Sequence, residues 1–348
     1  MESSFISTLV LLCILLVSHG ASALPANKTA LKQVVIINKK GPYLGVVVPN
    51  PFELGPLMVP GVFKPSVHIP FVDLGGRRFH IGRVADRKVI VVMTGLSMLN
   101  AGITTQQLLD FFAITGIVHY GIAGSTNSSL HVGDVTIPKF WSHTGLWNWQ
   151  RFGQGPNDPL SLEVNGDFTR KLGFLHFGDN NVPEGSATNL LNNVWYQPEE
   201  IFPVTGTPEV RQHAFLVQVD PHFYGLSHQL KCDALQDLPL QSCINSTSCL
   251  SSKPKIVFDL HGASANVFLD NAAYRSFLST KFSISLVDME SAAVALVSLQ
   301  NEVPFIAIRS MSDLAGGSVH SNEAIVFGGL AAQNAVDVVV KFIKLLPK

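Results

Sequence analysis

The chain has 348 residues, of which 47% are hydrophobic and 14% are charged. This length and apolar content suffice for a sizeable core, and they exclude an intrinsically disordered protein. The formal net charge is -1 and lysine and arginine form no run, so charge gives no reason to expect nucleic acid or an anionic membrane as a partner. A small molecule is the expected ligand.

Residues 1–23 have the features of a secretory signal peptide. The apolar stretch LVLLCILLV is followed by Ala21, Ser22 and Ala23, which form an A-x-A cleavage site. The stretch is too short for a membrane span, which needs roughly 20 apolar residues. We therefore predict cleavage after Ala23, entry into the secretory pathway and no membrane contact after cleavage.

Short apolar runs separated by small and polar residues follow, which is the pattern of buried parallel strands. The run 43–48 (YLGVVV) is predicted to be the first strand, and PNPFELGP after it predicts a turn and a helix start. The glycines of GGRR predict a hairpin turn within 67–81. Further strands are predicted at 88–93, 118–122 and 132–137, with a helix after the first of them.

The pattern loosens between residues 140 and 255. This segment is rich in Pro and Asn, contains Trp141, Trp147 and Trp149, and has helix-like patterning only around 223–235. We predict that it forms a loop-rich insertion over the substrate edge of the sheet, where it would set substrate choice. The tryptophans are interpreted as packing or lid residues.

Cysteines and sequons indicate processing along the secretory route. Once the signal is removed, three clustered cysteines remain, and they predict a disulfide whose pairing the sequence leaves open: Cys232, Cys243 and Cys249. CxxC and HExxH spacings are absent and the 12 histidines are scattered, so we expect no metal site. The sequons that are candidate glycosylation sites begin at Asn27, Asn127 and Asn245.

Regular patterning resumes after residue 255. It predicts a helix at 271–278, a strand at 283–287, a helix at 289–299, a strand at 305–308 and a last amphipathic helix at 324–346. Strands that alternate with helices predict an α/β fold in which helices flank a mostly parallel, partly mixed central sheet in three layers, α/β/α. Without an internal repeat or a linker, we expect one domain over 40–346.

Two acidic residues follow two of these late strands. Glu290 in VDMESAAVA and Asp313 in IRSMSDLAGG both stand where an apolar run gives way to small and polar residues. Ligands of open α/β sheets bind at the carboxyl ends of the strands, so the pair predicts a site that holds a polyol with one carboxylate and transfers a proton with the other. The alternative is structural, with Glu290 at a helix N-terminus and Asp313 as a turn or cap residue.

Four segments in order resemble the nucleoside phosphorylase superfamily, in the branch of methylthioadenosine/S-adenosylhomocysteine nucleosidases and uridine phosphorylases. They are YLGVVVPNPFE, VVMTGLS, YGIAGSTNSSLHVGDVTIP, and VDMESAAVA with IRSMSDLAGG, within residues 43 to 345. The signal peptide and the cysteine-bearing segment make the chain most similar to the secreted plant bark or vegetative storage proteins of this family. This resemblance implies an extracellular or vacuolar location.

The resemblance implies cleavage of an N-glycosidic bond, in which the ribose becomes oxocarbenium-like and negative charge builds on the base. Asp313 matches the acid that protonates or hydrogen-bonds N7 of a purine, and Ser312 would orient it. Glu290 matches the residue that accepts hydrogen bonds from the ribose hydroxyls, because a carboxylate can accept two at once. Met289 would pack against the sugar.

The attacking group is water in the nucleosidases and phosphate in the phosphorylases, and this chain has features of both. Glu53 in NPFE matches the nucleosidase base that activates water. Thr94 and Gly95 resemble the phosphate-contacting pair of the phosphorylases, and the nearby cations are Arg77, Arg78 and Arg83. We favour hydrolysis without a cofactor. Inorganic phosphate would be the co-substrate of a phosphorylase.

Phe268 in ASANVFLDN resembles the aromatic that lines the base pocket of the nucleosidases, although the family aspartate of this segment is replaced. A core position is the alternative for Phe268. Gly124, in the GIAG segment, allows close backbone approach to a ligand, or it simply serves a tight turn. His119 is interpreted as a packing residue.

Two functions follow from these residues. The first is cleavage of purine-type nucleosides by a secreted enzyme. The second is a storage protein that keeps the fold as a nitrogen reserve. A storage role requires no base, sugar anchor and acid, so the presence of Glu53, Glu290 and Asp313 favours the enzyme. The resemblance also implies a homo-oligomer in which a neighbouring subunit completes the ribose end of the site.

Overall fold

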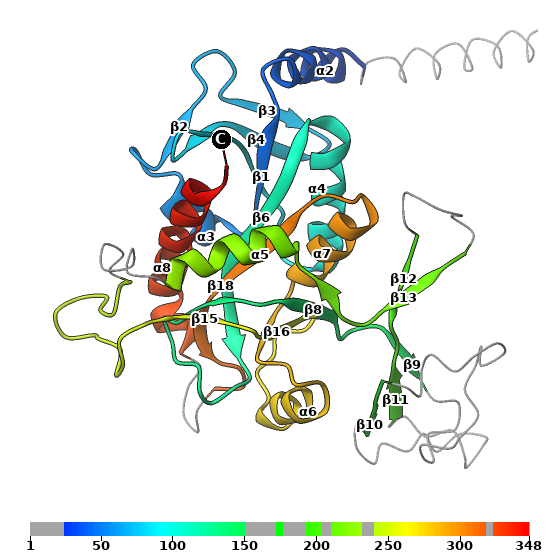
Figure 1. The fold of residues 1–348 in the computed structure, drawn as a ribbon, viewed down its shortest axis with the longest axis vertical. Coiled ribbons are helices and arrows are strands. Elements are labelled where there is room, and N and C mark those ends of the chain that lie inside the picture. The colour runs from blue at the N-terminus through cyan, green and yellow to red at the C-terminus, as the bar shows by residue number, and fades with distance from the viewer. Residues whose placement is uncertain are drawn as a thin grey trace, which may run out of the picture.

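A computed structural model describes residues 24–149, 172–176, 193–202, 210–231, 240–317 and 323–347. The predicted signal peptide and Cys232 lie outside the described residues, as does the side chain of Asn27. The central sheet and the helices on its two faces lie within these ranges (Figure 1).

A 13-stranded sheet forms the centre of the described chain. Its middle consists of strands that run parallel, β1 between β5 and β6, and β18 beside β6. These strands are almost entirely buried, which explains their apolar sequences. Their bounds are Tyr43–Val48 (β1), Arg87–Met93 (β5), Ile114–Ser125 (β6) and Phe305–Leu314 (β18).

Antiparallel strands extend one edge of the sheet and make it mixed. Here β4 pairs with β5, β3 and β2, and a turn at Gly75 and Gly76 joins β3 to β4 as predicted from GGRR. Both glycines have a positive φ, 60° and 77°, which a residue with a side chain rarely adopts. The bounds are Phe63–Pro65 (β2), Phe71–Leu74 (β3) and Arg77–Val84 (β4).

Helices cover both faces of the sheet, which confirms the α/β/α layers (Figure 1). The helix α8, 22 residues long, packs on β18 and β6 together with α5, and α4 packs with α7 on the other side. Although α8 is long and apolar enough to cross a membrane, more than half of its apolar window is buried inside the protein. The bounds are Met98–Phe111 (α4), Pro221–Ser227 (α5), Ser291–Gln300 (α7) and Ala324–Leu345 (α8).

Shorter helices complete the layers. The N-terminal helix α2 lies beside β3, α3 follows β1 directly and continues into the 3-10 turn η1, and α5 continues into η2. The short α3 begins at the predicted place because Asn50 caps it, accepting the N–H of Glu53 at 3.1 Å. The bounds are Leu24–Asn38 (α2), Pro51–Leu54 (α3), Gly55–Leu57 (η1), His228–Lys231 (η2) and Ala272–Phe282 (α6).

Residues 140–255 do not behave only as an insertion. Two short strands of this region, β8 and β14, belong to the central sheet, where β8 pairs in parallel with β16. The remaining described strands form a three-stranded and a two-stranded sheet away from the centre (Figure 1). The bounds are Phe140–His143 (β8), Trp147–Trp149 (β9), Phe174–His176 (β10), Asn193–Tyr196 (β11), Glu199–Ile201 (β12), Gln212–Ala214 (β13) and Val217–Gln218 (β14).

The last strands differ from their predicted bounds. Asp313 does not follow β18 but lies inside it, because the polar residues after Ile308 are buried and bonded to neighbouring strands. The strand β6 is likewise longer than 118–122 at both ends. The remaining strands of the central sheet are Val135–Ile137 (β7), Ile256–Phe258 (β15), His261–Ser264 (β16) and Leu286–Asp288 (β17).

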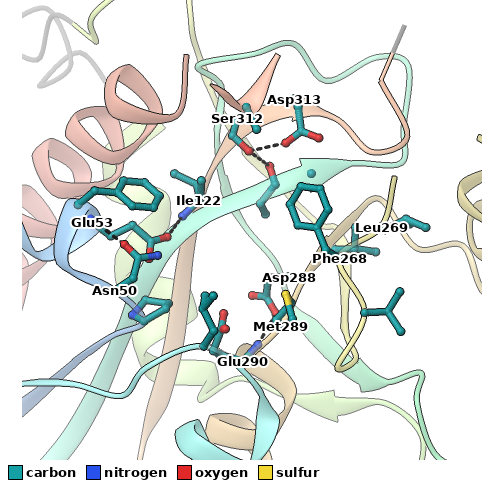
Figure 2. Close-up of a pocket in the computed structure, with 18 of the residues that line it drawn as sticks. Asn50, Glu53, Ile122, Phe268, Leu269, Asp288, Met289, Glu290, Ser312 and Asp313 are labelled. Carbon is teal, nitrogen blue, oxygen red and sulfur yellow. Dashed lines mark hydrogen bonds between the residues drawn. The ribbon is translucent and has the colours of Figure 1, made fainter. Parts of the chain in front are cut away.

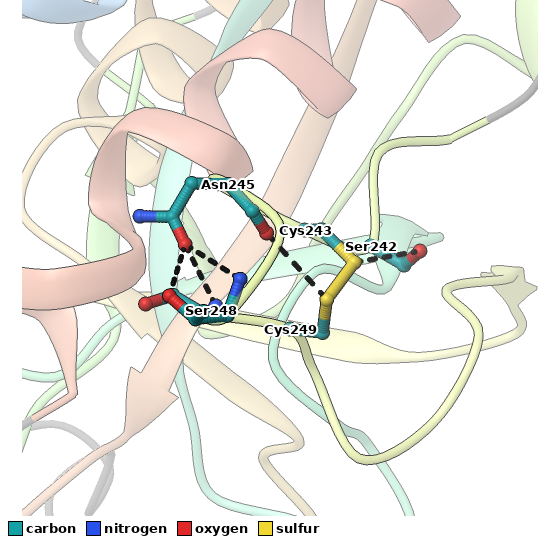
Figure 3. Close-up of a disulfide and its surroundings, with 6 residues drawn as sticks. Ser242, Cys243, Asn245, Ser248 and Cys249 are labelled. Atoms are coloured by element: carbon teal, nitrogen blue, oxygen red, sulfur yellow. Dashed lines mark hydrogen bonds between the residues drawn. A yellow bond between two sulfur atoms is a disulfide. The ribbon is translucent and has the colours of Figure 1, made fainter.

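One disulfide joins Cys243 and Cys249 and closes a small surface loop (Figure 3). Asn245 lies within this loop and is exposed, and its Oδ1 accepts hydrogen bonds from Thr247 and Ser248. The other sequon with a described side chain, at Asn127, is half-buried.

Candidate active site

A cavity of about 550 Å³ opens where β1, β6, β17 and β18 end, which is the edge predicted from the acidic pair (Figure 2). None of its described lining residues comes from 140–255, and much of that region lies outside the described residues, so its predicted place over the site stays a prediction. The lining consists of Pro49, Asn50, Phe52, Glu53, Leu96, Ile122, Ala123, Gly124, Val267, Phe268, Leu269, Val287, Asp288, Met289, Glu290, Ser312, Asp313, Ala324 and Ile325.

Glu53 is buried at one side of the cavity, and only one of its two carboxylate oxygens accepts a hydrogen bond from the described residues. Its side chain is 1% exposed, and Oε1 accepts the N–H of Ile122 at 2.7 Å. The other oxygen, Oε2, has no hydrogen-bond partner in the described protein. Burial raises the pKa of Glu53 to about 8, although Arg309 and the Ile122 N–H lower it. A carboxylate with a free oxygen and a pKa in this range suits a general base.

A buried arginine lies behind the cavity and faces three carboxylates. Arg309 of β18 is 0% exposed, and its Nε bonds Asp288 Oδ2 at 2.8 Å. Its Nη1 lies 3.9 Å from Glu53 Oε1, and its Nη2 lies 3.7 Å from Glu290 Oε2. A buried guanidinium requires such paired charges, and here it holds three acidic groups from two chain segments around one centre.

Glu290 is placed by the strained turn after β5. Its Oε1 accepts the N–H of Ser97 at 3.0 Å, and Ser97 has a φ of 92°, which a serine adopts only at an energetic cost. Burial raises the pKa of Glu290 to about 7, against the lowering effect of Arg309. The carboxylate of Glu290 is thus held in one orientation at the cavity wall.

The structural alternative for Glu290 was a carboxylate at a helix N-terminus, and the capping hydrogen bonds at this helix come from a different residue. Glu290 stands at the N-cap of α7, but its side chain makes no capping bond. Asp288 caps the helix instead, because its Oδ1 accepts the N–H groups of Glu290 and Ser291, each at 3.1 Å. The side chain of Glu290 therefore remains available to the cavity.

Asp313 lies at the upper side of the cavity in Figure 2, next to Ser312. Ser312 donates its hydroxyl to Asp313 Oδ1 at 2.5 Å, and this hydrogen bond fixes the orientation of the carboxyl group. Gly124 lies beneath this group, and a Cβ at Gly124 would come within 3.5 Å of Asp313 Oδ2 and 3.0 Å of the Cβ of Ala315. The absence of a side chain at Gly124 therefore keeps the space beside Asp313 open.

Met289 and Phe268 supply apolar walls, and Figure 2 shows Phe268 across the cavity from Glu53. Phe268 is 65% exposed, so the alternative of a core position is wrong. An exposed ring at a cavity wall offers a flat face against which an aromatic base can stack.

The residues considered for phosphate lie elsewhere. Thr94 and Gly95 do not line the cavity, and the Thr94 hydroxyl donates to the carbonyl of Gly95 at 2.6 Å. The candidate arginines also point to other partners: Arg77 bonds Thr104 and Asn100, Arg78 bonds Asp73, and Arg83 bonds the Asp86 carbonyl. Among the described lining residues none is a lysine or an arginine.

Sequence reasoning missed Arg309, Asp288 and Ser97, and it gave His119 only a packing role. The signal for Arg309 was present, since one arginine in the apolar run FIAIRSM must be paired if that run is a buried strand. Asp288 stood two residues before Glu290 in a typical N-cap position. In the described ranges no group of three or more His, Cys, Asp or Glu side chains has an arrangement that could hold a metal ion.

The raised pKa of Glu53 predicts that this residue lowers the free energy of unfolding at neutral and alkaline pH. In the folded protein the Glu53 carboxyl keeps its proton up to about pH 8. In the unfolded chain, where its pKa has the ordinary value of 4.5, it loses the proton at lower pH. The free energy of unfolding therefore falls as pH rises between these values, on the order of 1.4 kcal/mol per pKa unit. Glu53→Gln has no such titration, so we expect it to stabilise the protein above pH 8 and to match the wild type near pH 4.5.

Urea denaturation at both pH values measures this difference. Glu200→Gln, at an exposed glutamate that pairs with Arg211, is the control and should show little change in stability with pH. An equal effect of Glu53→Gln at both pH values would contradict the prediction.

Comparisons with known proteins identify the family of this chain. A family model described as the phosphorylase superfamily matches residues 43–182 and 225–344. Bark storage protein A of Populus deltoides is 33% identical over 305 residues, which cover 87% of this chain and 89% of that protein. The 5'-methylthioadenosine/S-adenosylhomocysteine nucleosidase of Halalkalibacterium halodurans is 26% identical over 240 residues, which cover 68% of this chain and 73% of that protein.

Solved structures share the fold. The native futalosine hydrolase of Helicobacter pylori aligns with a TM-score of 0.59 at 17% identity, covering 87% of this chain and 98% of that one. A 5'-methylthioadenosine/S-adenosylhomocysteine nucleosidase of the same organism, in complex with butyl-thio-DADMe-Immucillin-A, aligns with a TM-score of 0.58 at 18% identity, covering 87% and 98%. The nucleosidase relatives support N-glycosidic bond cleavage at the level of the family. The chain belongs to the phosphorylase superfamily.

Proposed function

We propose that this protein hydrolyses the N-glycosidic bond of purine-type nucleosides. The observation that carries the proposal is the buried carboxylate of Glu53, which faces the cavity with its Oε2 unpartnered. A buried polar atom without a partner costs free energy, so its presence at a cavity wall favours a bound water or substrate group as its partner.

The reaction distributes protons between two carboxyl groups. Glu53 removes a proton from water as the water oxygen bonds to C1′ of the ribose. The bond between C1′ and the base nitrogen breaks, its electron pair stays with the base, and Asp313 gives a proton to N7. Glu290 accepts hydrogen bonds from the ribose hydroxyls, which strengthen as the sugar becomes oxocarbenium-like. Phe268 stacks on the base, and Met289 packs against the sugar.

Charge supports water over phosphate as the attacking group. No lysine or arginine is among the described lining residues, so the lining offers a phosphate dianion no cationic partner. Arg309, behind the cavity, is already paired with Asp288. The Thr94 hydroxyl, bonded to Gly95, is also engaged elsewhere.

Base release with and without phosphate tests the proposal. We expect the protein without its signal segment to release the base from methylthioadenosine, adenosine or inosine in phosphate-free buffer, with little effect of added phosphate. Glu53→Gln should lower this rate by about 10²-fold or more, because a neutral amide cannot accept the proton from water. Uridine is the comparison substrate for the purine preference. Strict dependence on phosphate would exclude hydrolysis.

A storage role is the second candidate, and it is favoured by the 33% identity to bark storage protein A. The same assay separates the two functions. A protein that binds purine nucleosides but releases no base from any of them would support storage and would contradict the catalytic roles of Glu53 and Asp313.

The secretory route, glycosylation and assembly are further parts of the proposal. The disulfide Cys243–Cys249 favours an oxidising compartment, and the exposed Asn245 is the best-placed sequon for a glycan. Mass spectrometry of the secreted protein would locate the new N-terminus and any glycan. A homo-oligomer is favoured by a stripe of exposed apolar side chains next to the cavity, Leu96, Leu99 and Ile103, and sedimentation would report its size.

A further inference from the structure

His119 of β6 is fully buried and contacts the arginine at the centre of the site. Its Nε2 is bonded to Nη2 of Arg309, and its Nδ1 lies 2.9 Å from the carbonyl oxygen of Val47. A guanidinium can only donate, so Nε2 accepts and the ring proton lies on Nδ1, where it is donated to Val47. Burial, followed by the charge of Arg309, holds the pKa of His119 well below its usual value, which agrees with a neutral ring.

This contact determines how Arg309 distributes its N–H groups. Nε is taken by Asp288 and by the Ser291 hydroxyl, and Nη1 donates to the Ile122 carbonyl at 3.2 Å. His119 takes one of the two N–H groups of Nη2 and anchors this end of the guanidinium, with Glu290 3.7 Å from Nη2 and Glu53 3.9 Å from Nη1. Both distances exceed a hydrogen bond, so neither carboxylate is closed off by the guanidinium.

We propose that His119 is a positioning residue: by accepting an N–H of Arg309 it holds the guanidinium at the longer ion-pair distances of 3.7 Å from Glu290 and 3.9 Å from Glu53, short of direct hydrogen bonds, which leaves both carboxylates open to the substrate. This inference rests on the proposed hydrolysis for its link to turnover. A simple packing residue would fill the same space without an acceptor at this position.

The groups that face Arg309 come from every segment packed against it. They are Glu53 after β1, Asp288 at the end of β17, Glu290 after that strand, and His119 on β6. Next to His119, Tyr120 donates its hydroxyl to the backbone carbonyl of Glu53. Asp288 is held by the helix cap in addition to Arg309, so Glu290 and Glu53 are the acceptors within reach of a guanidinium that loses His119. A direct hydrogen bond from the guanidinium to either one would shorten the ion pair and lower the pKa of that carboxyl further.

Two substitutions separate the two bonds of the ring. In His119→Asn the amide nitrogen can replace Nδ1 and keep the bond to Val47, while the acceptor for Arg309 is lost. In His119→Gln the amide oxygen can replace Nε2 and keep the acceptor, while the bond to Val47 is lost. Both variants remove ring volume from the core, so a merely structural role of His119 would give similar results for the two.

The pH profile of kcat/KM is the first readout. We expect the rising limb of this profile to move to lower pH by about one unit in His119→Asn. We also expect kcat/KM above pH 8 to fall about tenfold or more, because Glu53 becomes a weaker general base and Glu290 is partly occupied by Arg309. His119→Gln should keep the wild-type position of this limb. The same shift in both variants, or in neither, would overturn the inference.

The pH dependence of stability provides a second readout that needs no turnover. In the wild type the raised pKa values of Glu53 and Glu290 make the free energy of unfolding fall from about pH 4.5 to about pH 8. This fall should be clearly smaller in His119→Asn and retained in His119→Gln. If the wild type cleaves no nucleoside but only His119→Asn flattens the curve, the proposed function fails and the inference stands. If both variants keep the wild-type curve, the inference fails whatever the activity.

Discussion

Asp313→Asn is expected to lower kcat for purine nucleosides by about 10²–10⁴-fold while the protein stays folded, which is the range for loss of a general acid. The asparagine keeps the size of the side chain and can still accept the Ser312 hydroxyl, so local geometry changes little. It has no acidic proton to give to the departing base. Base release under saturating substrate measures the effect, and circular dichroism with a thermal melt checks the fold.

Asp337→Asn is the matched control for this variant. Asp337 is a half-buried aspartate on α8 that accepts the side-chain amide of Gln333 at 2.9 Å, and it lies outside the cavity lining. The same chemical change there should leave kcat within about twofold, in line with a substitution away from the site. An Asp313→Asn protein with full activity would show that the base leaves without a proton from this residue.

The middle strands β1 and β5 of the central sheet were predictable from sequence because their side chains are buried on both faces. The run 43–48 matches β1 at both ends, and 88–93 differs from β5 by one residue. The hairpin at Gly75 and Gly76 was predictable because its turn needs two residues with a positive φ. In each case one local requirement determines both the sequence pattern and the structure.

The charged centre of the site was harder to predict because it depends on register. Arg309 meets Glu53 only because β18 lies beside β6 and β6 beside β1, with Arg309 opposite Gly121. No local pattern near Glu53 contains that pairing. The two acidic residues identified from sequence could be placed at one edge, but their shared partner on a neighbouring strand could not.

The region 140–255 was interpreted as an insertion because its strands are short. The strand β8 has four residues and β14 has two, and their apolar patterns are too brief to distinguish them from loops. Their place in the sheet comes from contacts with distant residues. Trp141, for example, packs over Gly262 of β16, where a Cβ would come within 2.6 Å of the indole ring. Such a match between a large residue and a glycine is visible only in three dimensions.

Some groups of the site lower the stability of the folded protein, and their neighbours partly offset this effect. Burial raises the pKa values of Glu53 and Glu290, so both carboxylates lower stability near neutral pH, while Arg309 and backbone N–H groups partly offset that cost. The strained φ of Ser97 adds to it. This pattern is expected where chemistry rather than stability determines the choice of residues.

Gly121→Ala is expected to disrupt this centre from the backbone side, lowering kcat/KM by about 10²-fold or more. A Cβ at Gly121 would overlap Nη1 of Arg309 and Oε1 of Glu53, and it would lie 3.1 Å from Cδ of Glu53. Both side chains are buried, so they have little room to retreat. The carboxylate of Glu53, the general base, would move relative to the cavity. We also expect the free energy of unfolding to fall by about 1–3 kcal/mol, because the added methyl group overpacks the core.

Gly102→Ala is the control that gives this result its meaning. Gly102 lies inside α4, and a Cβ there would meet nothing within 4 Å, so alanine should stabilise the helix by about 0.5–1 kcal/mol and leave activity unchanged. Urea denaturation and base release on both variants give stability and activity separately. If Gly121→Ala loses stability but keeps the wild-type kcat/KM, then the close placement of Arg309 and Glu53 serves folding alone. If kcat/KM falls about 10²-fold while the protein remains folded, the absence of a side chain at Gly121 helps to position the general base Glu53.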